Sequence, residues 1–359
     1  MGMILASTDW EKELENKNVD ESWKCIKRQY LEAEAICIPY AGTRKKKKSH
    51  FISKETIKLI KERNHMFNLF KQTDISMYYE KYKTIRNKVN KMIKADKAKE
   101  TLKLVTNFKE SKKAFYGYVR SKQVVRTKIL QLRKRDDTMT QDDTETAEEL
   151  LNFFQSVFVD EGKGAVPTFQ RHPEGKPVTD IGHLEITQED VEKKLLNLID
   201  DKAPGPDGLH PKALKELASV LGVPLAILFN KSLQEGALPE DWKCANVISV
   251  FKKGLKTEAG NYRPVSLTSV PCKVMESVLR DKMLKHLDAN DLLSHNQHGF
   301  TRNRSCLTNL LETLEEWTQA LDEGYGVDAI FLDYQKAFDT VPHQRLISKL
   351  KGYGIGGCC

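Results

Sequence analysis

Residues 329–339 read Ala-Ile-Phe-Leu-Asp-Tyr-Gln-Lys-Ala-Phe-Asp, and they carry the strongest indication of how this chain folds. The apolar run from Val327 to Leu332 is typical of a buried strand, which would deliver Asp333 at its carboxyl end. A carboxylate in such a place is costly unless it has a partner. That partner is most often a helix cap or a salt bridge, but a hard divalent cation such as Mg²⁺ also takes oxygen ligands. Asp333 is therefore a candidate metal ligand.

Five motifs follow one another along the chain. They are a Pro-Gly-Pro-Asp-Gly loop within 202–209, two segments at 238–254 and 261–269, Asn-Gln-His-Gly-Phe within 296–302, and Phe-Leu-Asp-Tyr-Gln-Lys-Ala-Phe-Asp-Thr-Val at 331–341. Their order and spacing resemble the reverse transcriptases of non-LTR, LINE-type retrotransposons. The last is similar to motif A of that family, and the segments at 238–254 and 261–269 are similar to its fingers motifs. The resemblance covers residues 187–353 and is strongest to the jockey and chicken-repeat branches.

The resemblance implies a fold and a chemistry. The fold is α+β, with the fingers and part of the palm of a right-hand polymerase behind a basic, mostly helical region. The chemistry is RNA-directed DNA synthesis, in which two metal ions clamp the attacking and leaving oxygens. Asp333 would bind both Mg²⁺ ions, and Phe338 would lie against the incoming sugar and exclude a 2′-hydroxyl. Phe338 as an ordinary core aromatic is the alternative, and Asp339 is expected to orient or cap.

The two fingers motifs supply positive charge for the triphosphate. Arg263 can make a bidentate contact with phosphate, and either Lys252 or Lys253 would add a point charge. The sequence does not distinguish the two lysines, and a basic hairpin tip exposed to water is the alternative for all three residues. By resemblance, Gln297 and Gly299 lie near the template strand and the nascent base pair. The implied partners are an RNA template, a DNA primer or RNA–DNA hybrid, and a dNTP.

A polymerase palm needs further carboxylates downstream of motif A, usually in an aromatic-x-Asp-Asp hairpin. The Asp-Asp pairs at 136–137, 142–143 and 200–201 all precede motif A, and none has an aromatic residue two positions before it. We therefore expect the chain to stop before the palm is complete and to be inactive alone, because one carboxylate cannot hold two metal ions. Two rival interpretations stay open: a non-catalytic module that binds RNA or an RNA–DNA hybrid, and an inert relic reading frame.

Positive charge is concentrated in one part of the chain. The formal net charge is +8, but residues 44–135 hold 29 Lys and Arg against 7 Asp and Glu, a net charge of +22. Such a block indicates a nucleic-acid partner, although a solvated helix pair is the simpler alternative. Aromatic residues interleaved at 78–82 and 108–118 could stack on bases, but they are more typical of a helical core. We expect a basic linker region at 1–135, an acidic helix and linker at 136–183, and the reverse transcriptase region at 184–359.

Cysteine usage and hydropathy limit the cellular compartments in which this chain is expected. Seven scattered cysteines without a Cys-x-x-Cys pair favour a reducing environment, and no apolar run is long enough to span a membrane. We expect an intracellular protein of the nucleus or cytoplasm, and the oligomeric state stays open. The basic run is a nuclear localisation signal, a phosphate contact or a solvated linker; its residues are Arg44, Lys45, Lys46, Lys47 and Lys48.

Overall fold

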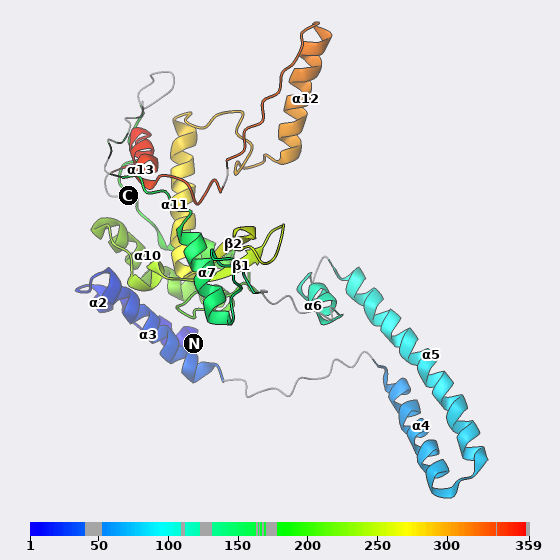
Figure 1. Cartoon of the computed structure of the whole chain (residues 1–359). Helices are drawn as coiled ribbons and strands as arrows, with labels where there is room; N and C mark the ends of the chain where they lie inside the picture. Colours follow the sequence, from blue (N-terminus) through cyan, green and yellow to red (C-terminus); the bar gives the residue numbers. More distant parts are fainter. Residues whose placement is uncertain are drawn as a thin grey trace. The chain divides into compact units, whose positions relative to one another are not determined.

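The computed structural model describes residues 1–39, 52–108, 112–122, 131–162, 164, 166, 169, 178–334 and 336–356. The chain divides into two compact units (Figure 1): unit 1 is Met1–Pro39 with Gln131–Cys359, and unit 2 is Tyr40–Leu130. Within the expected basic region 1–135, residues 1–39 belong to unit 1 and residues 40–130 to unit 2. The basic run at 44–48 lies outside the described residues.

Unit 1 holds short helices, longer helices and one hairpin of strands. Its α-helices are α1 (Gly2–Ala6), α2 (Trp10–Leu14), α3 (Val19–Cys37), α7 (Asp143–Gln155), α8 (Gln188–Leu196), α9 (Pro211–Glu216), α10 (Ala218–Glu235), α11 (Val270–Ala289), α12 (Cys306–Asp322) and α13 (His343–Gly352). Its 3₁₀ helices are η1 (Glu240–Lys243) and η2 (Ala259–Asn261), and its strands are β1 (Ala245–Phe251) and β2 (Tyr262–Thr268).

The main hydrophobic core joins the first helices of the chain to helices two hundred residues later. Trp23, Ile26 and Tyr30 recur at helical spacing on α3 and are fully buried, in one cluster with apolar residues of α8, α10 and α11. The sequence begins α3 with an Asn18–Glu21 capping box, which also separates α3 from α2. The apolar pattern of residues 9–38 predicts a single amphipathic helix, but the structure has two helices there.

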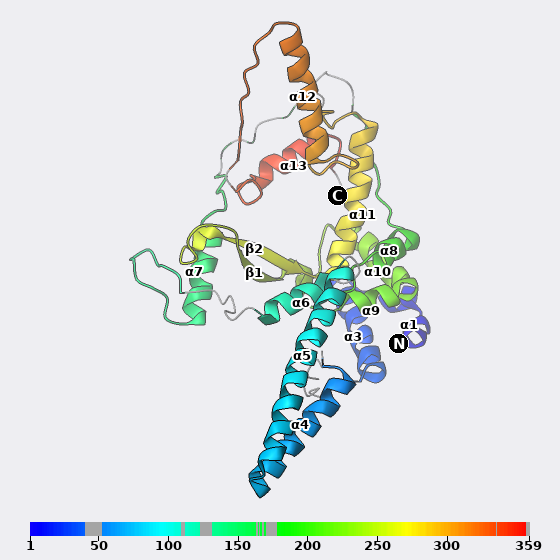
Figure 2. The ribbon, with the colours of Figure 1, turned by 90° about the vertical axis from the view of Figure 1, so that its right-hand side faces the viewer.

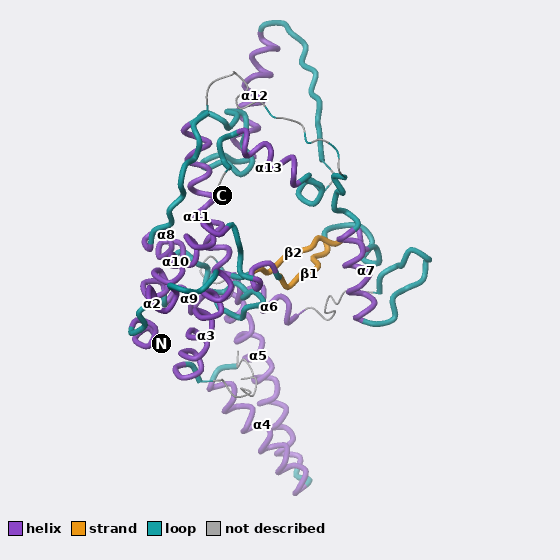
Figure 3. Tube along the Cα trace, turned by 90° about the vertical axis from the view of Figure 1, so that its left-hand side faces the viewer, coloured by secondary structure: helices purple, strands orange, loops and turns teal. Residues whose placement is uncertain are grey.

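The strands form one antiparallel hairpin, in which Ala245 pairs with Thr268 and Phe251 with Tyr262 (Figure 3). One face of the hairpin is covered, because Tyr262 is buried with Leu132 and Leu150 of a second, smaller core. This mixture of helices with a small antiparallel sheet agrees with the expected α+β class.

Unit 2 is built on a helical hairpin. α4 (Lys54–Thr73) and α5 (Ser76–Thr106) lie side by side, and the shorter α6 (Lys112–Lys122) follows (Figure 2). Asp96 of α5 accepts hydrogen bonds from the Ser53 amide and the buried Thr56 hydroxyl, and so helps to begin α4. Aromatic pairs join the two helices, Phe67 with Tyr82 and Phe70 with Tyr79. These aromatics pack within the hairpin.

The predicted strand at 327–333 is wrong for this structure. Residues 325–334 follow α12 as an irregular segment, and Ile330, Phe331 and Leu332 are 79–88% exposed. A strand needs a neighbouring strand to satisfy its backbone groups, and no other described segment pairs with this one. The apolar character of the run was identified correctly, but its partners are not among the described residues.

Local patterns predict a strand at 244–251, an extended segment at 262–268, and helices over 270–288, 305–323 and 342–353. The structure confirms all five with small shifts at their ends. Among the described residues, no helix has the length and apolar character that crossing a membrane requires.

Candidate nucleotide site

The β1–β2 hairpin presents two of the predicted phosphate-binding cations on one face. Arg263 is directly opposite Val250, and the Lys252 amide continues the ladder by donating to the Asn261 carbonyl oxygen at 2.9 Å. Side chains alternate along a strand and paired residues share a face, so Lys252 lies on the Arg263 face. Phe251 and Tyr262 occupy the opposite face, with ring centroids 5.6 Å apart. The register therefore separates Lys252 from Lys253, which the sequence could not do.

These cations are available to an anion. Lys252, Lys253 and Arg263 are exposed, and within the described residues none of the three forms an ion pair. Lys256, in the turn of the hairpin, instead lies over the Phe251 ring at 5.6 Å. The exposed face of the hairpin thus offers uncompensated positive charge.

Motif A has a different environment. Asp333 is exposed and makes no hydrogen bond or ion pair within the described part of the chain. No hydrogen bond or ion pair between described residues joins Asp333 to Lys252, Lys253 or Arg263. The described residues also hold no group of three or more His, Cys, Asp or Glu that could bind a metal ion.

The turn after Asp333 is nevertheless held by two ring contacts. Phe338 is 78% exposed, and its ring packs edge-on against Phe300, with centroids 5.9 Å apart. Lys336 lies over the Phe153 ring of α7 at 3.8 Å, and burial lowers the pKa of its ammonium group, an effect that Asp339 opposes. Motif A is therefore linked to the Asn-Gln-His-Gly-Phe segment through the very residue expected to contact the sugar.

The predicted template residues lie in a turn that is fastened to α12. The Gln297 side-chain amide donates to the Gly299 carbonyl oxygen at 2.9 Å, and a Cβ at Gly299 would come within 3.3 Å of that amide nitrogen. Between them His298 is buried, with its ring nitrogens 2.9 Å from the Thr308 hydroxyl and 2.8 Å from a Glu312 carboxylate oxygen.

Sequence reasoning missed His298, which anchors this turn. A second link comes from Arg304, whose guanidinium lies 3.2 Å from the Glu312 carboxylate. The only indication in the sequence was that His298 lies between Gln297 and Gly299, which were selected as residues near the template.

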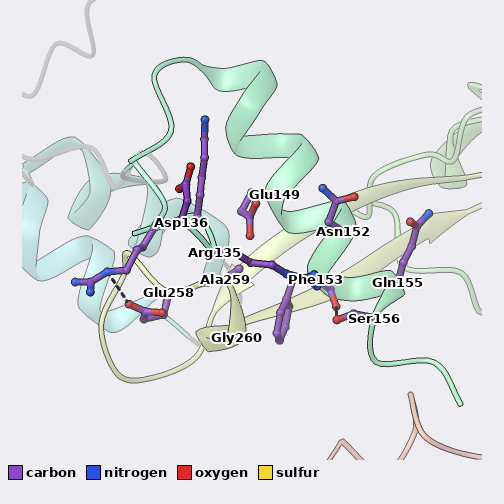
Figure 4. Close-up of a pocket in the computed structure, with 12 residues that line it drawn as sticks. Arg135, Asp136, Glu149, Asn152, Phe153, Gln155, Ser156, Glu258, Ala259 and Gly260 are labelled. Atoms are coloured by element: carbon purple, nitrogen blue, oxygen red, sulfur yellow. Dashed lines mark hydrogen bonds and ion pairs between the residues drawn. The ribbon is translucent and has the colours of Figure 1, made fainter. Parts of the chain in front are cut away.

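A pocket in unit 1 lies beside the hairpin but is separate from these residues (Figure 4). It is formed by residues 133–136, α7 and η2, and none of the seven predicted site residues lines it. Its charges are mixed: Arg133 pairs with Glu258 at 3.5 Å, and Asp136 and Glu149 also line the pocket. Nothing in its lining favours an anionic ligand.

Comparisons with known proteins agree with the motifs. A family model described as reverse transcriptase (RNA-dependent DNA polymerase) matches residues 250–358. The RNA-directed DNA polymerase from mobile element jockey of Drosophila melanogaster is 33% identical over 168 residues, which are 46% of this chain and 18% of the relative. The probable RNA-directed DNA polymerase from transposon BS of the same fly is 30% identical over 167 residues, again 46% and 18%.

A longer but weaker similarity extends over more of the chain. The transposon TX1 uncharacterized 149 kDa protein of Xenopus laevis is 24% identical over 284 residues, which are 78% of this chain and 21% of that protein. The chain spans about a fifth of the length of the curated relatives that it matches.

Residues 250–358 are thus a segment of a reverse transcriptase domain. The resemblance to the reverse transcriptases of non-LTR, LINE-type retrotransposons, which the motifs indicate, is confirmed.

Proposed function

We propose that this chain contributes the fingers and the beginning of the palm to an RNA-directed DNA polymerase of a retrotransposon. The observation that carries the proposal is the register of the β1–β2 hairpin, which places Lys252 and Arg263 on one exposed face. Two cations on one face can hold the phosphates of an incoming dNTP, and phosphoryl transfer depends on such positioning and charge stabilisation. The RNA template, the DNA primer and the dNTP are partners of the complete polymerase.

Asp333 is the proposed metal ligand, and the described residues do not complete a two-metal site. Its carboxylate is exposed and free to bind a hard cation such as Mg²⁺, which would neutralise charge on the phosphates. A second carboxylate group is needed to hold two ions, and no suitable cluster exists in the described residues. Phe338 would contact the sugar of the dNTP, and Gln297 and Gly299 would contact the template. The Phe300–Phe338 contact would have to rearrange when the substrate binds.

Binding of a fluorescent dNTP to the purified chain tests the nucleotide site. Lys252→Ala and Arg263→Ala should each weaken binding by roughly tenfold, because each removes a charge-assisted contact worth about 1.5 kcal/mol or more. Lys253→Ala is the matched control: it removes the same charge one residue away and should have a smaller effect. Equal losses for all three variants would indicate nonspecific attraction and would remove the support for this site.

We infer a second activity, binding of nucleic acid by unit 2, from a separate observation. α5 carries nine Lys and Arg against three Asp and Glu, and all nine basic side chains are exposed. The same charge was the basis for the rival interpretation of a non-catalytic RNA-binding module. The two activities are compatible in one protein, since the cations belong to different units.

A further inference from the structure

Three motif segments that the proposed chemistry leaves without a role meet at the base of the β1–β2 hairpin. Asp241 and Trp242 of η1 come just before β1, Ser269 comes just after β2, and Asp207 belongs to the Pro-Gly-Pro-Asp-Gly loop. Ala245 pairs with Thr268, so the start of β1 and the end of β2 are adjacent. A Cβ at Gly205 would lie 2.6 Å from the Thr268 carbonyl, which shows how closely the loop packs against this base.

α3 holds this base from the other side. One carboxylate oxygen of Asp241 accepts hydrogen bonds from the Trp23 indole at 2.9 Å and from the Lys27 ammonium at 2.6 Å. The Lys27 contact is the largest cause of the lowered pKa of the Asp241 carboxyl. Asp20, on the same helix, accepts from the Glu240 amide at 3.1 Å. Two residues of η1, Glu240 and Asp241, are thus tied to α3 by hydrogen bonds that involve Asp20, Trp23 and Lys27.

Aromatic packing adds to these polar contacts. The rings of Trp23 and Trp242 meet edge-on, with centroids 5.2 Å apart, and both side chains are buried. Tyr30 is one helical turn beyond Lys27 on the same side of α3 and is fully buried; burial is the main cause of its raised pKa, and the Asp207 carboxylate adds a smaller effect. We name the set Trp23, Lys27, Tyr30, Asp207, Asp241 and Trp242 the hairpin clamp.

We propose that α3 is the positioning element of the β1–β2 hairpin and that the hairpin clamp sets the direction in which Lys252 and Arg263 are presented. A two-stranded hairpin is marginally stable alone and needs packing at one end to hold its direction. The described contacts supply that packing at the base, where η1 enters β1. The expected effect of the clamp on dNTP binding rests on the proposed triphosphate role of Lys252 and Arg263. Its expected effect on the hairpin does not.

Hydrogen exchange of the full chain, followed by mass spectrometry, tests the clamp. Lys27→Met removes the ion pair and keeps the Trp23–Asp241 hydrogen bond, Asp241→Asn keeps an acceptor for Trp23, and Asp241→Leu removes both contacts. Exchange of the amides in residues 245–268 should rise roughly tenfold for the first two variants and further for Asp241→Leu, since each of the first two removes a charge-assisted hydrogen bond and the third removes both contacts. The double variant Lys27→Met/Asp241→Leu should show the same exchange at residues 245–268 as Asp241→Leu alone.

A matched control lies in the same unit. Lys194 of α8 and Asp281 of α11 form another ion pair between helices, so Lys194→Met removes a comparable contact that does not touch η1. It should leave exchange at 245–268 unchanged. Equal exchange increases for Lys194→Met, or increases spread evenly over unit 1 in the Asp241 variants, would overturn the proposal.

Binding of the fluorescent dNTP separates the two proposals. Clamp variants that loosen the hairpin should weaken dNTP binding in the order Asp241→Asn, then Asp241→Leu, without change in the charge of the exposed face. If Arg263→Ala leaves dNTP binding intact, the proposed function fails while the exchange data still decide the clamp. Suppose that Arg263→Ala weakens dNTP binding, but that clamp variants which loosen the hairpin leave dNTP affinity unchanged. The positioning role is then refuted.

Discussion

A Cβ atom at position 205 would lie 2.6 Å from the carbonyl carbon and oxygen of Thr268 and 2.7 Å from the Ser269 amide nitrogen. These are backbone atoms at the end of β2, so they cannot move aside as a flexible side chain would. Gly208, three residues later, has a φ of +77° with open space around it. Glycine is therefore needed at 205 because the loop approaches β2 closely, and at 208 because the backbone is left-handed there.

Replacement of these glycines should show the difference. Gly205→Ala should lower the free energy of unfolding by about 1–3 kcal/mol, because the methyl group forces the loop away from β2. Gly208→Ala should cost about 1 kcal/mol through its left-handed conformation alone. Denaturant unfolding measures both. Gly117→Ala in α6 is the control, since nothing lies within 4 Å of its Cβ and alanine favours helix; a loss at 205 no larger than at 117 would contradict the close approach.

Asp207 should make stability depend on pH in the unusual direction for a carboxyl group. It is 4% exposed, one of its oxygens has no hydrogen-bond partner among the described residues, and burial raises its pKa. A raised pKa in the folded state means that its contribution is complete below the unfolded pKa and is lost as pH rises through the folded pKa. Asp207→Asn should therefore stabilise the chain at pH 8 and have little effect near pH 4.

Urea unfolding of both proteins across this pH range checks the sign. Asp241→Asn is a useful contrast, because Lys27 lowers the pKa of Asp241 and that contribution is present at high pH and lost as pH falls. If Asp207→Asn destabilised the chain equally at pH 4 and pH 8, titration of the Asp207 carboxyl would be ruled out as a contribution to stability.

At the scale of elements, local patterns predicted most helices and both paired strands. The helices α11, α12 and α13 carry clear apolar periodicity or a proline near the first turn, and the strands β1 and β2 alternate between two faces. The strand expected at 327–333 failed because a strand depends on a partner elsewhere in the chain, which local residues do not encode. The same limit hid the role of α3: its amphipathic face was visible in the sequence, but the partner of that face was not.

The candidate site was predictable by residue type and not by arrangement. Three of the five motifs supplied the cations and Asp333, but distinguishing Lys252 from Lys253 required the register of the hairpin. His298 was missed, since a histidine between a glutamine and a glycine has no spacing that indicates burial against α12. The roles of Lys252, Arg263 and Asp333 in nucleotide binding stay predictions.

The exposed cations of α5 predict weak, salt-sensitive binding of RNA. If residues 44–135 contact about five phosphates, the slope of log affinity against log salt should be roughly −3.5 to −4.5, because bound phosphates release counterions. Charge reversal at Lys81, Lys88 and Lys91 should remove most of this binding and flatten the slope. Fluorescence anisotropy with an unstructured RNA measures both quantities.

The control for unit 2 reverses three exposed lysines of unit 1. Lys212, Lys273 and Lys285 change the net charge of the chain by the same amount. Equal losses of affinity in the two triple variants would show that net charge alone attracts RNA, and a flat salt response in the wild type would contradict phosphate binding.

At the scale of the whole molecule, the 359-residue chain should not extend a primer on an RNA template with Mg²⁺ and dNTPs. Among the described residues no cluster of carboxylates forms around Asp333, and two metal ions need more than one carboxylate to offset their mutual repulsion. A primer-extension gel measures this. Templated, Mg²⁺-dependent extension that disappears with Asp333→Ala would show that the expectation is wrong.

The core that joins residues 1–39 to the rest of unit 1 has a consequence for protein engineering. The chain leaves unit 1 after Pro39 and returns at Gln131, so unit 2 is an insertion and covalent continuity through it is not what holds α3 in place. A protease site between Asn107 and Phe108 would leave the α4–α5 hairpin on the first fragment. After cleavage the two fragments should co-elute in native buffer and separate in denaturant. Trp23→Ala should weaken their association, because a buried tryptophan contributes about 3–5 kcal/mol. The molecule would then act as a self-complementing split protein, in which the attachment of one fragment reports on the integrity of the core.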